Sequence, residues 1–205
     1  MTRTLTAIAI VFVCAGSGSA HQLDEYLQAT RIGIEENRIA LEFSLTPGSR
    51  VADRVFAIID GDRDRRISPA EIEAYARKVL SDVSLEVDGR ACTPTLARAE
   101  SPSWPEMRDG VGTVHVTATT DSRLAPGRHQ VRLVNRHQSD IGVYLVNALK
   151  PSGRVSIQAQ ERDAQQHGIR LEVAVSRAYF AAWQIMGAIV IVGGLVLFRR
   201  ASKSG

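Results

Sequence analysis

Four carboxylates between residues 60 and 71 follow a spacing that can hold a cation. Counted from Asp60 as position 1, aspartates stand at positions 1, 3 and 5, and Glu71 stands at position 12. Aspartate oxygens lie close to the backbone and suit a tight turn, whereas a glutamate can reach back from a following helix. Calcium is a hard ion that accepts a flexible shell of about 6–8 oxygens. The segment therefore predicts a Ca²⁺ site.

This ligand order is that of an EF-hand loop, in which a backbone carbonyl at position 7 and a group at position 9 complete the shell. The predicted metal ligands are Asp60, Asp62, Asp64, Arg66 through its carbonyl, Ser68 and Glu71. Position 6 normally carries glycine because the chain turns there with positive φ, but here it carries Arg65. That substitution costs on the order of 1 kcal/mol.

Arginines also reduce the charge of this loop. Arg63, Arg65 and Arg66 stand beside the four carboxylates. We therefore expect weak binding, with a dissociation constant of about 10⁻⁴–10⁻³ M, and a structural rather than a sensing ion. The alternative is a degenerate loop that binds nothing and is held by hydrogen bonds between aspartates and the backbone.

Apolar residues at helical spacing flank the loop on both sides. They are Val51, Val55, Ile58 and Ile59 before it, and Ile72, Tyr75, Ala76, Val79 and Leu80 after it. Ser68 and Glu71 have the spacing of a capping box, with Pro69 at the first helical position. The pattern predicts an EF-hand-like helix–loop–helix over about residues 49–81.

Both ends of the chain have the composition of targeting segments. Residues 1–20 combine a basic start, a short apolar run and small residues, which is typical of a signal peptide whose removal exposes His21. Residues 178–198 are apolar and are followed by a basic tail, 199–205. About 20 apolar residues match a bilayer core of about 30 Å. We expect a single-pass transmembrane helix with a cytoplasmic C-terminus.

The net charge of +3 comes from these ends. Four of the 25 basic residues, Arg3, Arg199, Arg200 and Lys203, lie in them, and all 22 acidic residues lie between. The exported part, 21–177, is therefore slightly acidic, which excludes a nucleic-acid-binding role based on charge. Cys92 is its sole cysteine, so the expected domain has no internal disulfide.

The exported domain is predicted to be mainly β. Residues 28–46 alternate as a hairpin that turns at Glu36 and Asn37, and a second hairpin turns at Asp88 and Gly89. Further alternating runs cover 114–118, 131–135, 143–148, 155–159 and 169–175. Residues 93–110 are predicted to be a long mobile connection. We expect an antiparallel Ig-like sandwich of about seven to nine strands, with the helix pair inserted between the second and third.

Three segments in this order resemble a known family. They are Ala20-His21-Gln22-Leu23-Asp24, then Ile59-Asp60 with the loop, then Val87-Asp88-Gly89. The chain resembles the exported N-terminal region of bacterial membrane proteins related to the hydrogenase/urease accessory permeases of nickel uptake. The resemblance covers residues 20 to about 177, and it implies an inner-membrane protein whose domain faces the periplasm. Those relatives continue into several membrane helices, so a transport role does not carry over to one predicted helix.

The histidines offer a second metal hypothesis. A mature His21 would present an amine and an imidazole, which together chelate copper or nickel. The alternative function is therefore an accessory protein of a transition-metal uptake system. The other histidines, His115, His129, His137 and His167, lack a metal-ligand spacing and are expected to be isolated at or near the surface. No nucleophile elbow, phosphate loop or Cys–His pairing is present. We expect a non-enzymatic module with an unidentified membrane or periplasmic protein partner.

Overall fold

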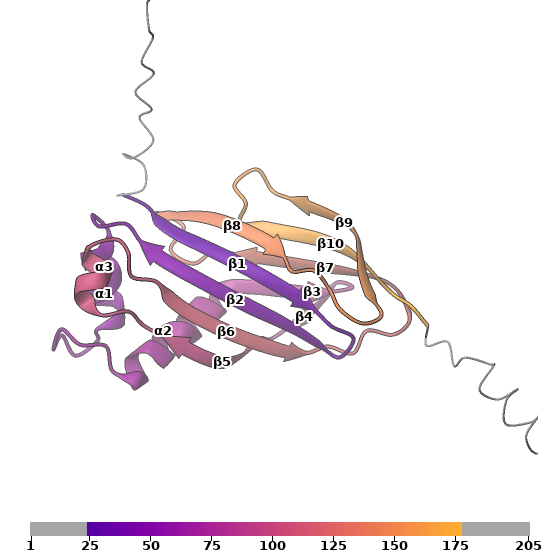
Figure 1. Cartoon of the computed structure of the whole chain (residues 1–205), viewed down its shortest axis with the longest axis horizontal. Coiled ribbons are helices and arrows are strands. Elements are labelled where there is room, and N and C mark those ends of the chain that lie inside the picture. Colours follow the sequence, from indigo (N-terminus) through magenta and orange to yellow (C-terminus); the bar gives the residue numbers. More distant parts are fainter. Residues whose placement is uncertain (1–23, 178–205) are drawn as a thin grey trace, which may run out of the picture.

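The computed structural model describes residues 24–177, which form two five-stranded sheets and three helices (Figure 1). The predicted signal peptide (1–20), His21, the predicted transmembrane helix (178–198) and the tail (199–205) lie outside the described residues. Between residues 24 and 177, no helix has both the length and the apolar character needed to cross a bilayer.

The first sheet has the strand order β5-β6-β2-β1-β8. Its strands are β1 (Tyr26–Ile34), β2 (Arg38–Pro47), β5 (Thr95–Glu100), β6 (Val114–Asp121) and β8 (Gly142–Ala148). The predicted β1–β2 hairpin is confirmed, with Ile34 opposite Ile39. The expectation of an antiparallel sandwich throughout is wrong at one pair, because β1 and β8 run parallel. Strand β8 arrives from the other sheet rather than through a tight hairpin, so no turn forces it to run against β1.

The second sheet has the order β4-β3-β7-β10-β9 and is antiparallel. Its strands are β3 (Val83–Val87), β4 (Arg90–Cys92), β7 (Gly127–Asn135), β9 (Val155–Arg162) and β10 (Gly168–Val175). The predicted turn between β3 and β4 is confirmed. Asp88 and Gly89 both have positive φ, 51° and 76°, which is the backbone geometry that a two-residue hairpin of this twist requires.

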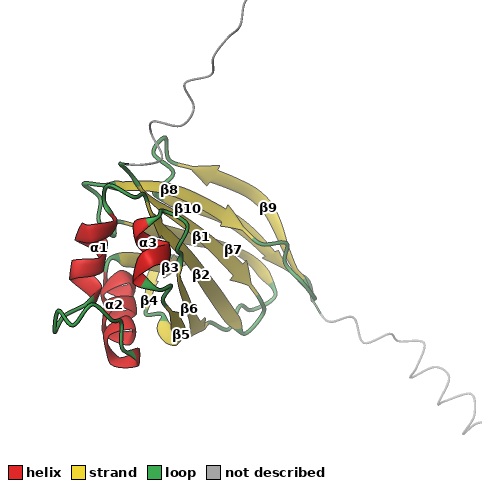
Figure 2. Cartoon of the chain, turned by 60° about the vertical axis from the view of Figure 1, so that its left-hand side comes forward, coloured by secondary structure: helices red, strands yellow, loops and turns green. Residues whose placement is uncertain are grey.

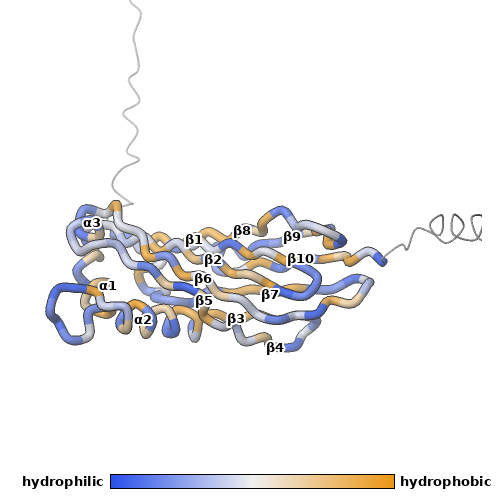
Figure 3. Tube along the Cα trace, turned by 60° about the horizontal axis from the view of Figure 1, so that its bottom comes forward, coloured by the Kyte–Doolittle hydropathy of each residue, from blue (hydrophilic) through white to orange (hydrophobic). Residues whose placement is uncertain are grey.

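One hydrophobic core lies against both sheets. Strand β2 alternates strictly, so that its Leu41, Phe43 and Leu45 are buried while the residues between them are only half-buried. Leu133 of β7 and Leu171 of β10 complete the core from the second sheet. In Figure 3 the segment joining the first two helices is coloured hydrophilic, in contrast to this core.

The predicted helix–loop–helix is confirmed as α1 (Ala52–Ile59) and α2 (Pro69–Ser81), which lie at one end of the sandwich (Figure 2). The Ser68–Glu71 capping box is present, and Pro69 opens α2 as expected. The buried faces of both helices belong to the same core as the strands. The predicted calcium loop, which joins α1 to α2, is therefore attached at both of its ends to helices that pack on the core.

The prediction of a mobile connection over residues 93–110 is wrong. This stretch forms β5 and the short helix α3 (Trp104–Arg108), so the described strands number ten rather than seven to nine. Ser103 and Glu106 form a capping box, and Trp104 packs against Phe56 of α1 with ring centroids 4.4 Å apart. Strand β5 is a largely exposed edge strand without apolar alternation, so the sequence pattern does not indicate it.

Candidate metal centre

Three of the predicted ligands come together at the end of α1. The carboxylate oxygens of Asp60, Asp62 and Glu71 all lie within 4.8 Å of one another. Asp60 is the C-cap residue of α1 and is only 4% exposed, whereas Asp62 is exposed and Glu71 is half-buried. A buried carboxylate next to two others costs free energy unless cations or N–H donors surround it.

Backbone N–H groups of the loop surround Asp60. Its Oδ1 accepts from the Asp64 N–H at 3.2 Å, and its Oδ2 accepts from the Arg65 N–H at 3.0 Å. Asp62 Oδ1 also accepts from the Asp64 N–H, at 3.0 Å. Asp64 Oδ1 accepts from the Arg66 N–H at 2.7 Å. These hydrogen bonds fold the loop back towards the end of α1 and fix the positions of its aspartate side chains.

Glu71 joins the two ends of the loop. Its Oε1 accepts from the N–H groups of Gly61 and Asp62, at 2.8 and 3.3 Å. Its Oε2 accepts from both the N–H and the hydroxyl of Ser68, each at 2.8 Å. The Ser68 backbone and side-chain hydrogen bonds, in that order, are the main cause that lowers the pKa of the Glu71 carboxyl to about 2. Glu71 is therefore ionised at neutral pH, as a cation ligand must be.

The remaining predicted ligands have other roles in the described structure. Asp64 is not part of the three-carboxylate group. The Ser68 hydroxyl serves the cap of α2, since it also accepts from the Glu71 N–H at 3.3 Å. Arg66 is tied to the loop through its N–H, and its predicted contribution is its carbonyl oxygen. The structure thus gathers the ligands at positions 1, 3 and 12 and leaves position 5 at the edge.

The backbone at Arg65 has the positive φ that the sequence pattern predicts, at 66°. Arg63 adopts a similar value, 63°, which the sequence did not indicate. Two arginines therefore adopt the left-handed conformation within three residues, which L side chains disfavour by about 1–2 kcal/mol each. The loop retains this shape because four aspartate–backbone hydrogen bonds hold it.

A buried chain of hydroxyl, imidazole and carboxylate groups connects α2 to the strands. His137 is completely buried, with Nδ1 2.7 Å from Asp82 Oδ2 and Nε2 2.9 Å from the Tyr75 hydroxyl. The Tyr75 hydroxyl lies 2.7 Å from that of Tyr26. The expectation that His137 is an isolated surface or half-buried histidine is wrong. Its partners come from α2 and β1, which sequence spacing could not reveal.

Three further polar side chains fix the backbone of His137. Gln28 and Tyr144 both donate to its carbonyl, at 2.6 and 2.7 Å, and its N–H donates to Asn135 at 2.9 Å. Asn135 also donates to Gln28 at 3.1 Å. Gln28 lies at an inward position in the alternation of β1. A polar residue on a core face requires buried hydrogen-bond partners, and this was the one feature of the sequence that could have indicated the network.

This network is suited to support rather than to proton transfer. Burial lowers the pKa of His137, although Asp82 opposes that shift, and burial raises the pKa of both Tyr75 and Tyr26. A neutral His137 satisfies every contact when Nδ1–H donates to Asp82 and Nε2 accepts from the Tyr75 hydroxyl. The network thereby fixes α2, and with it Glu71, to both sheets.

A scan against protein-family models finds no match to this sequence, and a search of curated proteins finds no similar chain. Function is therefore inferred from the residues themselves.

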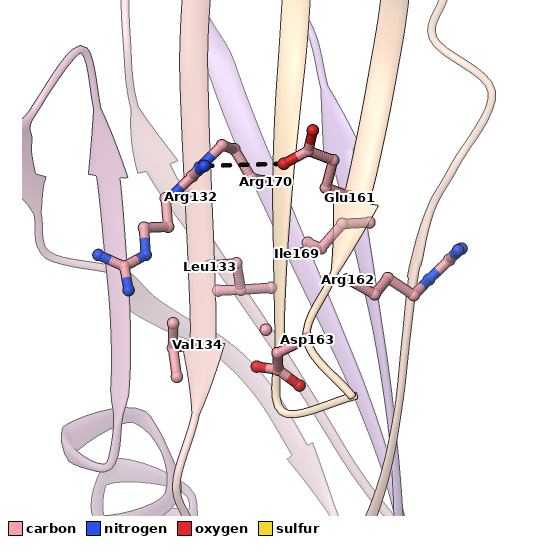
Figure 4. A pocket seen from close by; sticks show the side chains of 9 residues that line it. Arg132, Leu133, Val134, Glu161, Arg162, Asp163, Ile169 and Arg170 are labelled. Carbon is pink, nitrogen blue, oxygen red and sulfur yellow. Dashed lines mark ion pairs between the residues drawn. The ribbon is translucent and has the colours of Figure 1, made fainter. Parts of the chain in front are cut away.

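A separate hollow of ≈220 Å³ lies on the outer face of the second sheet (Figure 4). Arg170 forms an ion pair with Glu161 at 3.7 Å across it, and Asp163 accepts the His167 N–H. Arg162 points away and donates to the Val146 carbonyl at 2.7 Å. The described residues that line it include no serine, cysteine or histidine.

The acid sensitivity of the fold tests the role of Glu71. Its pKa is lower in the folded state than in an unfolded chain, where a glutamate titrates near 4.5. The stabilisation is therefore present above about pH 4.5 and is lost as the pH falls towards 2. We expect Glu71→Gln to be less stable than the wild type at pH 6 and to converge with it near pH 2, in urea unfolding across this range. Glu161→Gln, at an exposed carboxylate outside the loop, is the control and should follow the wild-type profile.

Proposed function

We propose that this chain is a membrane-anchored, extracytoplasmic module that binds Ca²⁺ and has no enzymatic activity. The observation that carries the proposal is the approach of the Asp60, Asp62 and Glu71 oxygens to within 4.8 Å of one another in the loop between α1 and α2. The ligand spacing of residues 60–71 gives independent support, because it is the order in which an EF-hand loop presents oxygens.

The donor set fits calcium better than a transition metal. The three grouped side chains are carboxylates, and neither histidine nor cysteine belongs to the group. Carboxylate and carbonyl oxygens favour Ca²⁺, Mg²⁺ and Mn²⁺, whereas imidazole and thiolate favour the later transition metals. A loop with exposed, adjustable ligands favours the larger Ca²⁺, because Mg²⁺ requires a near-octahedral shell at shorter distances. When bound, the ion would supply positive charge between carboxylates of both ends of the loop.

The proposal places the module at a membrane and gives it an Ig-like sandwich. The apolar run at 178–198 supports a single-pass anchor, and residues 1–20 support export. Two sheets that share one core support the sandwich assignment. By this proposal the domain faces the periplasm of a bacterial cell, and residues 199–205 face the cytoplasm.

Calorimetric titration of the full chain in detergent micelles tests the ion preference. We expect Ca²⁺ to bind with a dissociation constant of about 10⁻⁴–10⁻³ M and Mg²⁺ to bind more weakly. Asp62→Asn keeps an oxygen for the Asp64 N–H but removes the charge, and it should weaken Ca²⁺ binding by about tenfold or more. Asp121→Asn, on β6, changes the same charge outside the loop and should bind like the wild type.

One observation favours a second candidate, a docking module whose loop binds nothing. Each aspartate of the loop already accepts backbone hydrogen bonds, so the loop has internal support without an ion. Absence of Ca²⁺ heat at 10 mM would favour this candidate. Copper or nickel binding that requires an unblocked His21 amine would instead favour the accessory role in metal uptake.

A further inference from the structure

Residue 177, the last one described, lies on the side of the sandwich opposite the three helices (Figure 1). There, Val175 of β10 pairs with Val155 of β9 and with Gly127 of β7. The β1–β2 turn lies at the same end, because the Leu124 N–H donates to the Glu36 carbonyl at 2.8 Å. We call this the C-terminal end surface; it comprises residues 35–38, 88–90, 121–128, 150–154 and 175–177.

Basic side chains outnumber acidic ones on the C-terminal end surface. The basic residues are Arg38, Arg90, Arg123, Arg128, Lys150, Arg154 and Arg177, and the acidic residues are Glu35, Glu36, Asp88 and Asp121. Glu35 and Glu36 are already held by ion pairs with arginines. Asp88 accepts a hydrogen bond from His129. The local acidic groups are therefore largely occupied.

Four exposed cations of this surface have no ion pair, side-chain hydrogen bond or electrostatic partner among the described residues: Arg123, Arg128, Lys150 and Arg177. Arg90 is exposed as well but interacts electrostatically with Asp88. They come from the β6–β7 loop, the start of β7, the β8–β9 loop and the segment after β10. Arg123 and Arg90 also line a hollow of ≈370 Å³ at this end. Four separate segments thus place unpaired positive charge at this end of the sandwich.

We propose that the C-terminal end surface docks onto anionic lipid headgroups, with these four side chains at the level of the phosphates. The inference rests on the proposed function, because it takes residues 178–198 as the membrane anchor. Arg177 immediately precedes that segment, so the chain itself brings this surface, and no other, to the bilayer. Lysine and arginine near an anionic leaflet are attracted to it within a Debye length, about 10 Å at 0.1 M salt.

This docking would orient the calcium loop away from the membrane. The loop lies at the helical end of the sandwich, and β1 alone has 9 residues. A strand rises by about 3.3 Å per residue, so the loop would stand about 30 Å or more from the headgroups. The loop would then face the compartment and partners within it.

Hydrogen exchange of the full chain in lipid nanodiscs tests the inference. Discs of phosphatidylcholine alone are compared with discs that also contain phosphatidylglycerol. We expect slower exchange over residues 121–128 and 150–154 in the anionic discs, and this protection should disappear at about 0.5 M salt. The double variant Arg123→Gln/Arg128→Gln should lose the difference. Arg136→Gln, an exposed arginine beyond the other end of β7, is the matched control and should keep it.

Equal exchange in the two kinds of disc would overturn the docking surface while leaving the anchor intact. Release of the chain from both kinds of disc by alkaline carbonate would instead contradict the anchor. In that case, binding of the same full chain to preformed vesicles tests the C-terminal end surface. Salt-sensitive flotation with anionic but not neutral vesicles would support it, and no flotation with either would overturn it.

Discussion

Replacing His137 with alanine is expected to lower the free energy of unfolding by about 2–5 kcal/mol, far more than any other histidine substitution in the described fold. The change leaves a cavity where a completely buried ring stood. It also removes the acceptor of the Tyr75 hydroxyl and the donor to Asp82. Tyr75 is buried and keeps only the Tyr26 hydroxyl as a partner for its own hydroxyl, whereas the half-exposed Asp82 can bind water.

Urea unfolding of the full chain, followed by circular dichroism, measures this loss. His115→Ala is the matched control, because His115 is an exposed residue of β6 and should change stability by only about 0.5 kcal/mol or less. The pH dependence gives a second readout. The pKa of His137 is lowered in the folded state, so its contribution is full above the unfolded value near 6.5 and declines as the pH falls below it.

Other titratable groups also contribute to the pH dependence of stability and must be distinguished from His137. Asp82 and Lys78 act on His137 electrostatically in opposite directions, and Tyr75 stays neutral throughout because its pKa is raised. His129 behaves in the opposite sense, since Asp88 raises its pKa. The loss of stability caused by His137→Ala should therefore shrink as the pH falls below about 6.5. A loss below 1 kcal/mol at pH 7, or one that does not change with pH, would contradict the role assigned to His137.

Elements encoded by neighbouring residues were predictable. The two helices, the capping box at Ser68 and the β3–β4 turn all depend on residues within a few positions of one another. The same holds for the positive φ at Arg65, which follows from its place in the loop. For the candidate site, local spacing gave the ligand set, but only the structure separates Asp64 from the three grouped carboxylates.

Contacts between distant segments were not predictable in the same way. Tyr26 and Tyr75 are 49 positions apart, and Tyr75 and His137 are 62 apart, so no periodicity links them. The parallel pairing of β1 with β8 likewise depends on how β8 returns from the second sheet. Strand β5 is exposed and lacks alternation, so its place is decided by pairing with β6 rather than by its own composition.

Calcium should stabilise the fold, and Arg65 should limit how much. An ion that binds only the folded state contributes RT ln(1 + [L]/Kd), which is about 1.4 kcal/mol at 5 mM Ca²⁺ for a dissociation constant of about 0.5 mM. A domain of this size should show a rise in thermal midpoint of about 2–6 °C. Arg65→Gly should enlarge the rise, because one positive charge is removed and glycine carries no strain when the bound ion holds the left-handed turn at this position.

Two variants at position 65 separate these causes. Arg65→Gln removes the charge but keeps a side chain in the left-handed conformation, so its calcium-dependent rise should lie between those of the wild type and Arg65→Gly. Arg136→Gln removes a charge outside the loop and should match the wild type. Scanning calorimetry of the full chain, with and without 5 mM Ca²⁺, provides the measurement.

If Arg65→Gly gains no more from calcium than Arg65→Gln, the backbone at this position does not restrict the ion, and charge alone sets its affinity. If neither variant nor the wild type responds at 10 mM, the three carboxylates form a turn without an ion, and the docking module becomes the better account of the loop.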